Sequence, residues 1–216
     1  MMRIGRRVFL FGLLVLLAGC GGPGPSDLDP LPRQATVLAF GDSVTHGTGA
    51  DAGEDFPARL QAMTGWTVVN AGVPGDRADR ARERLEPTLR EHAPDLVLIG
   101  LGGNDFLRGR DPAQVKEDLR ELVATVRAHD AQPLLLAVPA PSAMGAAAGR
   151  LRDDGIYREL AREEQVPLVE NVLAAVLSDR SLRADPIHPN ADGYRQMAEQ
   201  IAEALADLGL WLALAP

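Results

Sequence analysis

Short apolar segments alternate with amphipathic segments of helical periodicity from Thr36 to Leu208, and this alternation constrains the fold more than any other feature. Continuous apolar segments such as Asp95–Leu101 are typical of strands that are buried on both faces. Strands that alternate with helices form a parallel sheet with helices on both sides. We therefore predict an α/β fold, a three-layer α/β/α sandwich with a mainly parallel sheet.

The periodicity and the turn signals place the individual elements. We predict strands over the apolar segments Thr36–Phe40, Thr67–Asn70, Asp95–Leu101, Pro133–Val138 and Val166–Val169. We predict helices over the amphipathic segments Phe56–Met63, Arg77–His92, Pro112–Ala128, Leu151–Glu164 and Ala191–Leu208. Asp111 is the expected N-cap of the third helix, and Pro87 is expected to kink or divide the second.

The composition fits one folded domain of ordinary size. The chain has 216 residues, of which 46% are hydrophobic and 24% are charged, so it can bury a sizeable core. Its formal net charge of −8 leaves no basic surplus with which to neutralise phosphates. We therefore expect no nucleic-acid partner.

The first residues have the pattern of an export signal. Arg3, Arg6 and Arg7 precede the apolar run Val8–Ala18, which is shorter than the ~20 residues that a membrane-spanning helix needs. The run leads into "LAGC", which resembles the lipobox of bacterial lipoprotein precursors, and Cys20 is the only cysteine of the chain. The alternative is an ordinary signal peptide with a chance cysteine.

These features predict three segments. We expect residues 1–19 to be a lipoprotein signal peptide and residues 20–35 to be the lipidated Cys20 followed by a flexible Gly- and Pro-rich tether. Residues 36–216 are then the functional domain, held at the cell envelope by the lipid. Gly21 after the cysteine favours the periplasmic side of the outer membrane if the cell has two membranes. The Sec and twin-arginine export routes both stay open.

Residues with chemically useful side chains follow the predicted strands. Ser43 follows the first strand, Gly75 the second and Asn104 the third. Asp185 and His188 lie in the loop before the last helix. In open parallel sheets, ligands bind outside the carboxyl ends of the strands. We therefore expect these residues to meet at one edge of the sheet.

The residue types fit nucleophilic catalysis. His188 can take the proton of the Ser43 hydroxyl near neutral pH, and Asp185 can fix the imidazole tautomer. The backbone N–H groups of Ser43 and Gly75 and the side-chain amide of Asn104 can donate to an oxyanion. Each residue also has a structural explanation, as a helix cap, a turn glycine or a polar loop residue.

Four sequence blocks, taken together, carry a family resemblance. In order, "FGDSVTHG", "NAGVPGD", "LGGND" and "DPIHPN" resemble the four blocks of the SGNH (GDSL-type) hydrolases. Ser43, Gly75, Asn104 and His188 match the four positions that name the family, and Asp185 matches the acid three residues before the histidine. The resemblance is closest to the bacterial thioesterase I/lysophospholipase and arylesterase-like branch.

The resemblance implies a flavodoxin-like fold and a function. It implies a triad of Ser43, His188 and Asp185 that forms an acyl-enzyme from esters or thioesters, with Ser43, Gly75 and Asn104 holding the oxyanion. It implies neither a metal nor a cofactor. We expect a serine ester hydrolase of the carboxylesterase/arylesterase, thioesterase or lysophospholipase type, with a small-molecule or lipid ester as substrate. The alternatives are a carbohydrate O-acetylesterase on the same site and a non-catalytic lipoprotein that binds acyl or glycan ligands.

The surroundings of the four blocks suggest further roles. Asp42 is expected to brace the nucleophile loop, and His46 to have a rim or structural role. The Ala- and Gly-rich segment Val138–Arg150 is expected to form a mobile loop near the acyl pocket. The nucleophile elbow of the α/β-hydrolases is disfavoured, because Thr45 stands where that motif needs glycine.

Overall fold

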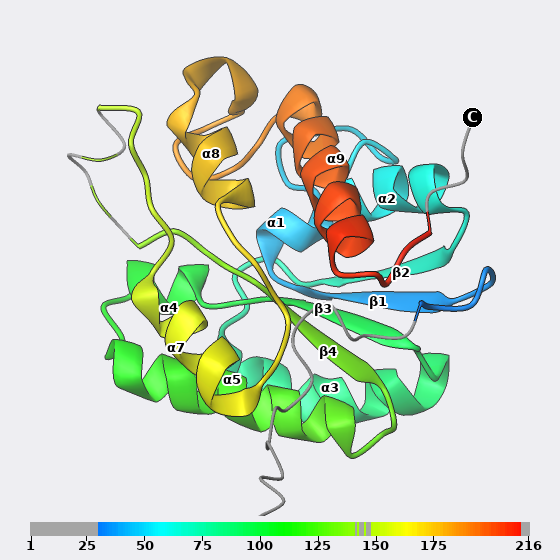
Figure 1. Cartoon of the computed structure of the whole chain (residues 1–216). Helices are drawn as coiled ribbons and strands as arrows, with labels where there is room; N and C mark the ends of the chain where they lie inside the picture. Colours follow the sequence, from blue (N-terminus) through cyan, green and yellow to red (C-terminus); the bar gives the residue numbers. More distant parts are fainter. Residues whose placement is uncertain (1–29, 141, 143–144, 146–147, 213–216) are drawn as a thin grey trace, which may run out of the picture.

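The domain is built around one parallel sheet, as the computed structural model of residues 30–140, 142, 145 and 148–212 shows (Figure 1). The five strands lie in the order β2-β1-β3-β4-β5, and each pair is parallel. The strands are β1 Thr36–Gly41, β2 Thr67–Gly72, β3 Leu96–Gly100, β4 Gln132–Leu136 and β5 Leu168–Val169. The predicted α/β class and flavodoxin-like sheet are confirmed.

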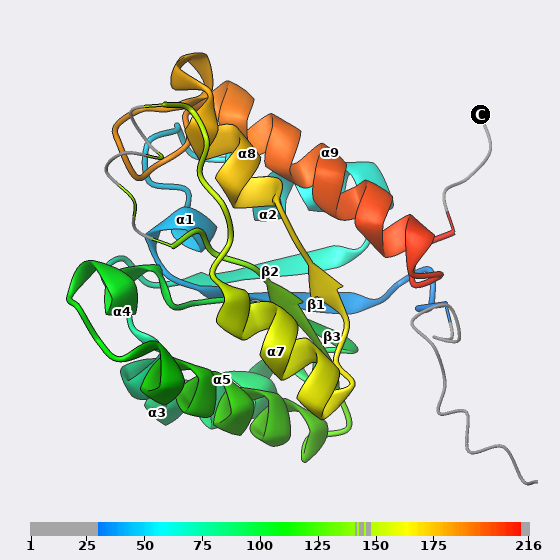
Figure 2. The ribbon, with the colours of Figure 1, turned by 60° about the vertical axis from the view of Figure 1, so that its left-hand side comes forward.

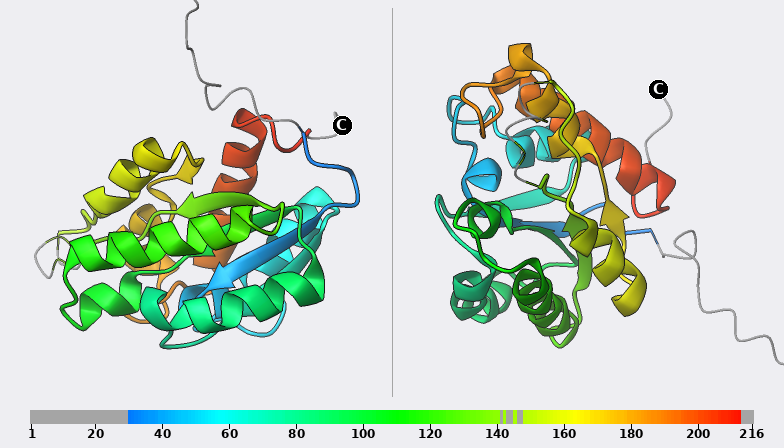
Figure 3. Two further views of the ribbon diagram at one scale, coloured as in Figure 1. Left: turned by 90° about the horizontal axis from the view of Figure 1, so that it is seen from below. Right: turned by 90° about the vertical axis from the view of Figure 1, so that its left-hand side faces the viewer.

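Helices cover both faces of the sheet. Helices α3 and α5 pack on each other below the sheet of Figure 1, with α7 beside α5, whereas α2, α9 and α8 pack together above it. The turned views show the same two layers (Figures 2 and 3). The longer helices are α2 Phe56–Thr64, α3 Ala78–His92, α5 Pro112–Arg127, α7 Gly155–Glu164, α8 Val172–Ser178 and α9 Ala191–Asp207. The shorter ones are α1 Ser43–His46, α4 Gly103–Leu107 and the 3₁₀ turn η1 Arg180–Leu182.

The central strands end at the same level of the sheet. In the registers of β1 with its two neighbours, Gly41 pairs with Gly72 on one side and with Gly100 on the other. The first two of these positions need glycine, because a Cβ on Gly41 would lie 2.1 Å from Thr45 Oγ1 and one on Gly72 would lie 2.1 Å from His46 N. Helix α1 therefore turns back directly over the strand ends and presents its first residue there.

Aspartate and asparagine N-caps start most of the longer helices. The Asp55, Asp111, Asp154 and Asn190 side chains accept a backbone N–H of the first turn of α2, α5, α7 and α9 respectively. Asp111 thus confirms the predicted cap of α5. Gly65, in the left-handed conformation at φ 74°, ends α2.

Two predictions about helices need correction. Helix α3 runs from Ala78 to His92 without a break, so Pro87 does not divide it; this proline lies on the exposed face, where water can satisfy the carbonyl that it leaves free. Helix α7 begins at Gly155 rather than at Leu151. Asp153 forms an isolated antiparallel bridge with Pro139, and the Leu151 N–H donates to Ser178 Oγ at 2.9 Å, so these residues are held outside the helix.

Part of the predicted N-terminal organisation lies outside the described residues. These are the expected signal peptide, Cys20 and the tether as far as residue 29. The remainder of the expected tether contacts the domain, because the Leu31 N–H donates to the Leu210 carbonyl at 2.9 Å and Ala35 is fully buried. No helix in the described part of the chain is long and apolar enough to cross a membrane.

Candidate active site

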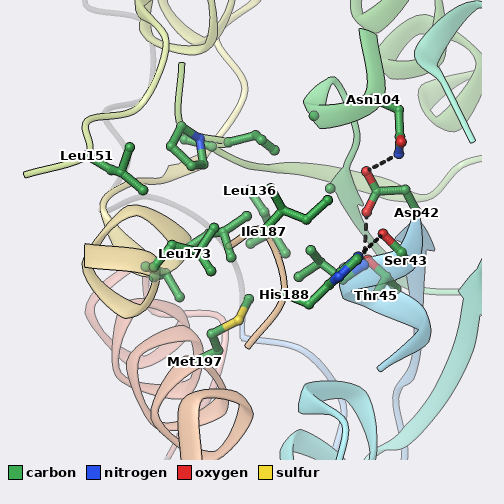
Figure 4. A pocket seen from close by; sticks show the side chains of 18 of the residues that line it. Asp42, Ser43, Thr45, Asn104, Leu136, Leu151, Leu173, Ile187, His188 and Met197 are labelled. Atoms are coloured by element: carbon green, nitrogen blue, oxygen red, sulfur yellow. Dashed lines mark hydrogen bonds between the residues drawn. The ribbon is translucent and has the colours of Figure 1, made fainter. Parts of the chain in front are cut away.

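Ser43 is the first residue of α1, at the carboxyl end of β1 (Figure 4). It is not the helix cap, because the Asp42 side chain caps α1 by accepting the Val44 N–H at 3.0 Å. Asp42 therefore braces the turn as the sequence predicts, and the Ser43 hydroxyl is left for other contacts. As the first helical residue, Ser43 also has a backbone N–H with no acceptor inside the helix.

His188 links Ser43 to Asp185. Its Nε2 lies 2.9 Å from Ser43 Oγ, and its Nδ1 lies 2.7 Å from Asp185 Oδ2. Since an ionised carboxylate only accepts, Nδ1 carries the proton and Nε2 is free to accept from the hydroxyl. Desolvation tends to raise the pKa of Asp185, but the hydrogen bonds from the His188 ring and from two backbone N–H groups hold it below its ordinary value.

Backbone contacts fix the loop that carries these two residues. Asp185 Oδ1 accepts the N–H groups of Ile187 at 2.8 Å and of His188 at 2.9 Å, so the side chain closes its own turn. The loop also packs against the chain after α1, where a Cβ on Gly49 would lie 2.4 Å from the Pro189 carbonyl oxygen. The position of the imidazole is therefore set by close backbone packing.

Asn104 enters the site from α4. Its Nδ2 donates to Asp42 Oδ2 at 3.1 Å, and both residues line the same cavity as Ser43. The turn before α4 is supported from below, because the buried Tyr157 hydroxyl donates to the Leu101 carbonyl at 2.6 Å. Burial raises the pKa of Asp42 to about 6, against the lowering effect of its hydrogen bonds from Val44 and Asn104.

Gly75 lies in the turn after β2 and does not belong to the cavity lining. Its φ of +80° is the left-handed conformation that favours glycine, and a Cβ there would meet nothing within 4 Å. The requirement for glycine at this position is therefore conformational. The structure brings Ser43, Asn104, Asp185 and His188 together and leaves Gly75 on the neighbouring strand end.

Two charged residues that the sequence analysis did not single out support this edge. Arg84 of α3 donates to the Gly41 and Ala71 carbonyls, each at 2.8 Å, and to the Asp76 carboxylate at 2.7 Å. It therefore ties the ends of β1 and β2 to the turn that follows β2. In the sequence, Arg84 looks like one more solvated charge on an arginine-rich helix, so no local signal indicates this role.

The second charged residue is Asp105, which follows Asn104 in the chain and is fully buried. Its Oδ2 accepts the Ala78 N–H at the start of α3 at 3.0 Å, and its Oδ1 accepts from Arg110 at 2.5 Å. Arg77, the N-cap residue of α3, makes no side-chain cap of its own. Asp105 thus fixes α4 to α3. Its only sequence signal is that it adjoins Asn104 in "LGGND".

An apolar cavity of about 290 Å³ opens at Ser43 and His188. Leu173 of α8 and Met197 of α9 point into it, and Leu151 and Leu173 lie across it from Ser43 (Figure 4). The predicted loop near the acyl pocket also contributes, since Val138, Pro139, Ala140 and Ser142 line the cavity. Positions 141, 143–144 and 146–147 of that loop lie outside the described residues.

His46, for which the sequence predicts a rim or structural role, is exposed and does not line the cavity. Among the described residues, no three His, Cys, Asp or Glu side chains are grouped so that they could hold a metal ion.

Comparisons with known proteins support the family resemblance that the four sequence blocks carry. The GDSL-like Lipase/Acylhydrolase family matches residues 39–196. The thioesterase 1/protease 1/lysophospholipase L1 of Escherichia coli (strain K12) is 36% identical over 178 residues, which are 80% of this chain and 84% of that protein. The esterase TesA of Pseudomonas aeruginosa is 33% identical over 207 residues, which are 90% of this chain and 98% of that protein.

The fold agrees as well. A solved crystal structure of TesA matches with a TM-score of 0.71 at 33% identity, over 80% of this chain and 99% of that one. The chain therefore belongs to the GDSL-like lipase/acylhydrolase family, and it is an enzyme that hydrolyses ester bonds.

Proposed function

We propose that this protein is a serine hydrolase of carboxylic esters or thioesters that works through an acyl-enzyme on Ser43. The observation that carries the proposal is the unbroken hydrogen-bond chain from Ser43 through His188 to Asp185 at the mouth of an apolar cavity. A nucleophile, a base and a group that orients the base are the components that acyl transfer requires.

The proposed steps assign one role to each of these residues and to the oxyanion donors expected from the sequence. Ser43 Oγ attacks the acyl carbonyl while His188 Nε2 takes the hydroxyl proton, and Asp185 stabilises the imidazolium that forms. The backbone N–H groups of Ser43 and Gly75 and the Asn104 amide donate to the oxyanion. His188 then protonates the leaving group. In the second half, it takes a proton from the water that attacks the acyl-enzyme, and it returns that proton to Ser43 Oγ as the acyl–Oγ bond breaks and the acid leaves.

The cavity favours substrates with an extended apolar acyl chain. Its volume of about 290 Å³ holds roughly ten groups the size of a water molecule, at ~30 Å³ each. Apart from the polar groups at its mouth, its walls are apolar, so they gain from covering alkyl groups. An acetyl group would leave most of this space unused, which makes a carbohydrate O-acetylesterase the weaker candidate. The names of the thioesterase and lysophospholipase relatives support the same preference.

We also propose that the mature protein is held at the cell envelope by a lipid on Cys20. The support is the order of a basic segment, an apolar run and "LAGC" in the first residues. The measurement is fractionation of cells that express the wild type or Cys20→Ala. The wild type should sediment with membranes, and the variant should not. Wild-type protein found only in the soluble fraction would contradict the lipid anchor.

The test of the proposed activity is chemical labelling of the nucleophile. A fluorophosphonate should modify the peptide that contains Ser43, and Ser43→Ala should abolish both labelling and hydrolysis of p-nitrophenyl esters. Ser142→Ala is a matched control, because Ser142 lines the same cavity but, within the described part of the chain, its Oγ accepts from the Gly145 backbone rather than bonding to a histidine. Turnover by the Ser43 variant at the wild-type rate would refute the proposal.

A further inference from the structure

Asp42 joins the nucleophile turn to the helix that carries Asn104. Its Oδ1 accepts the Val44 N–H at 3.0 Å, and its Oδ2 accepts from Asn104 Nδ2 at 3.1 Å. The residue is only 5% exposed, although it lines the cavity. Figure 4 shows the Asn104 amide directed at this carboxylate. Both oxygens of Asp42 are therefore occupied by donors, one from each side of the site.

The charge of Asp42 decides which way the Asn104 amide faces. The two ends of an asparagine amide are nearly equal in size, so the hydrogen-bond partner sets their orientation. An ionised carboxylate only accepts, and it therefore requires the NH2 end of Asn104. One N–H of that group is used by Asp42, and the second remains available to a substrate oxygen. A reversed amide would instead direct a carbonyl oxygen at the position where the oxyanion forms.

We propose that Asp42 is a positioning residue that holds the Asn104 amide in its donor orientation, so that Asn104 stabilises the oxyanion only while Asp42 is ionised. The proposal rests on the proposed function, because it assigns the amide to the oxyanion of ester hydrolysis. It adds a second residue whose ionisation controls turnover, beside His188.

The surroundings of Asp42 set the pH range in which its ionisation determines the orientation of the Asn104 amide. Burial raises the pKa of Asp42 to about 6, while the hydrogen bonds from Val44 and Asn104 and the charge of His188 lower it, and the charge of Asp76 raises it. Below that pH, Asp42 gains a proton and can donate to the Asn104 carbonyl oxygen, which reverses the amide. Activity should therefore fall as Asp42 gains its proton, because the oxyanion then loses the Asn104 donor.

Tyr157 and Tyr194, two buried titratable groups on which the charge of Asp42 acts, stay neutral over this range. Burial raises the pKa of both tyrosines above the ordinary value, and the charge of Asp42 adds to this effect. They therefore contribute no further titration between neutral and acid pH.

The decisive variant is Asp42→Asn. The oxygen of the new amide should keep the Val44 N–H, so its NH2 would face Asn104 and require the reversed amide. We expect kcat for p-nitrophenyl esters to fall by ~10²–10³, the loss typical of one oxyanion donor, with little change in KM. Asn104→Ala should lose a similar factor. The double variant should be no slower than Asn104→Ala alone, because Asp42 acts through Asn104.

The pH profile is a second readout that a purely structural role would not change. Around pH 6, log(kcat/KM) of the wild type should fall more steeply with acid than that of Asp42→Asn or Asn104→Ala, because only the wild type loses the Asn104 donor when Asp42 gains a proton. The comparison of the wild type with Asn104→Ala keeps the test valid if Asp42→Asn does not fold, which circular dichroism would reveal.

The chain offers a close control in Asp55. This residue also caps a helix, accepting the Ala58 N–H at 2.9 Å, and also accepts from an asparagine amide, that of Asn70 at 3.2 Å, but it does not line the cavity. Asp55→Asn should leave kcat unchanged.

Three results would overturn the role of Asp42: additive losses in the double variant, an Asp42→Asn enzyme with wild-type kcat, or equal acid slopes in all variants. Activity that survives Ser43→Ala would instead refute the proposed function, so the two failures are distinguishable.

Discussion

The carboxyl edge of the sheet has a polar half and an apolar half, and they are built differently. The polar half, at the ends of β1, β2 and β3, is held by hydrogen bonds among buried or half-buried charged groups, such as Asp42, Arg84 and Asp105. The apolar half, between β4, β5, α8 and α9, is held by side-chain packing of residues such as Leu173 and Ile201. We infer that the first half sets the chemistry and the second sets the acyl chain that reaches it.

The difference arises where the strands end. β1, β2 and β3 stop at glycines in register, which leaves the edge open to polar groups from the following turns. After β4, the chain continues as Ala137–Ala140 along the cavity wall. Substitutions in the polar half should therefore lower kcat for every substrate, whereas those in the apolar half should change the preferred chain length.

The largest effect should come from His188→Ala in the polar half. Loss of the base should lower kcat by at least ~10⁴, and Ser43→Ala/His188→Ala should be no slower than either single variant, because the residues act as a unit. Steady-state kinetics with p-nitrophenyl butyrate measure both. Independent, multiplying losses would show that Ser43 and His188 do not act in one step.

Asp42→Asn should lower kcat but should increase the stability of the fold. The folded pKa of Asp42 is raised from 3.8 to about 6, so its contribution to stability is complete below pH 3.8 and is lost as the pH rises through 6. Removing the buried charge should raise the free energy of unfolding at neutral pH by up to ~3 kcal/mol, at ~1.4 kcal/mol for each pKa unit. The gain should vanish in acid. Urea unfolding at several pH values tests this, and a gain that does not depend on pH would contradict it.

The smallest effect should come from Tyr157→Phe, beneath the polar half. The variant keeps the buried ring and loses the hydrogen bond to the Leu101 carbonyl. We expect a loss of about 1–2 kcal/mol in the free energy of unfolding, because a buried carbonyl loses its donor. The drop in kcat should be much smaller than that of Asn104→Ala, since the amide keeps its contact with Asp42. A loss of kcat as large as that of the Asn104 variant would show that the turn, not Asp42, places the amide.

The sequence predicts much of the polar half, because Ser43 and Asn104 directly follow strands whose ends the sheet brings together. Asp185 and His188 reach the same edge from the loop before α9, which the strand pattern alone does not indicate. The positions of the strands along the chain and most helix bounds are accessible because apolar periodicity reports burial, whereas the flavodoxin-like arrangement of the strands is implied by the family resemblance. Helix α8 was not predicted, since its seven residues are too short to show a period.

Contacts across the fold are harder to predict. Arg84 reaches the ends of β1 and β2 only because α3 lies beneath them, and Asp105 reaches the start of α3 only because α4 turns toward it. Neither local spacing nor residue type indicates such a contact. The start of α7 also depends on a partner distant in sequence, Ser178 of α8, which holds Leu151.

A single chain-length profile tests the division of the site into two halves most directly. We would measure kcat/KM for p-nitrophenyl esters from acetyl to dodecanoyl in the wild type, Asn104→Ala and Leu173→Trp. Asn104→Ala should lower the whole profile by a similar factor of ~10² without moving its optimum. Leu173→Trp, which fills the cavity across from Ser43, should leave the acetyl ester unchanged and move the optimum to shorter chains. A shifted optimum in the Asn104 variant, or a uniform loss in the Leu173 variant, would contradict the account.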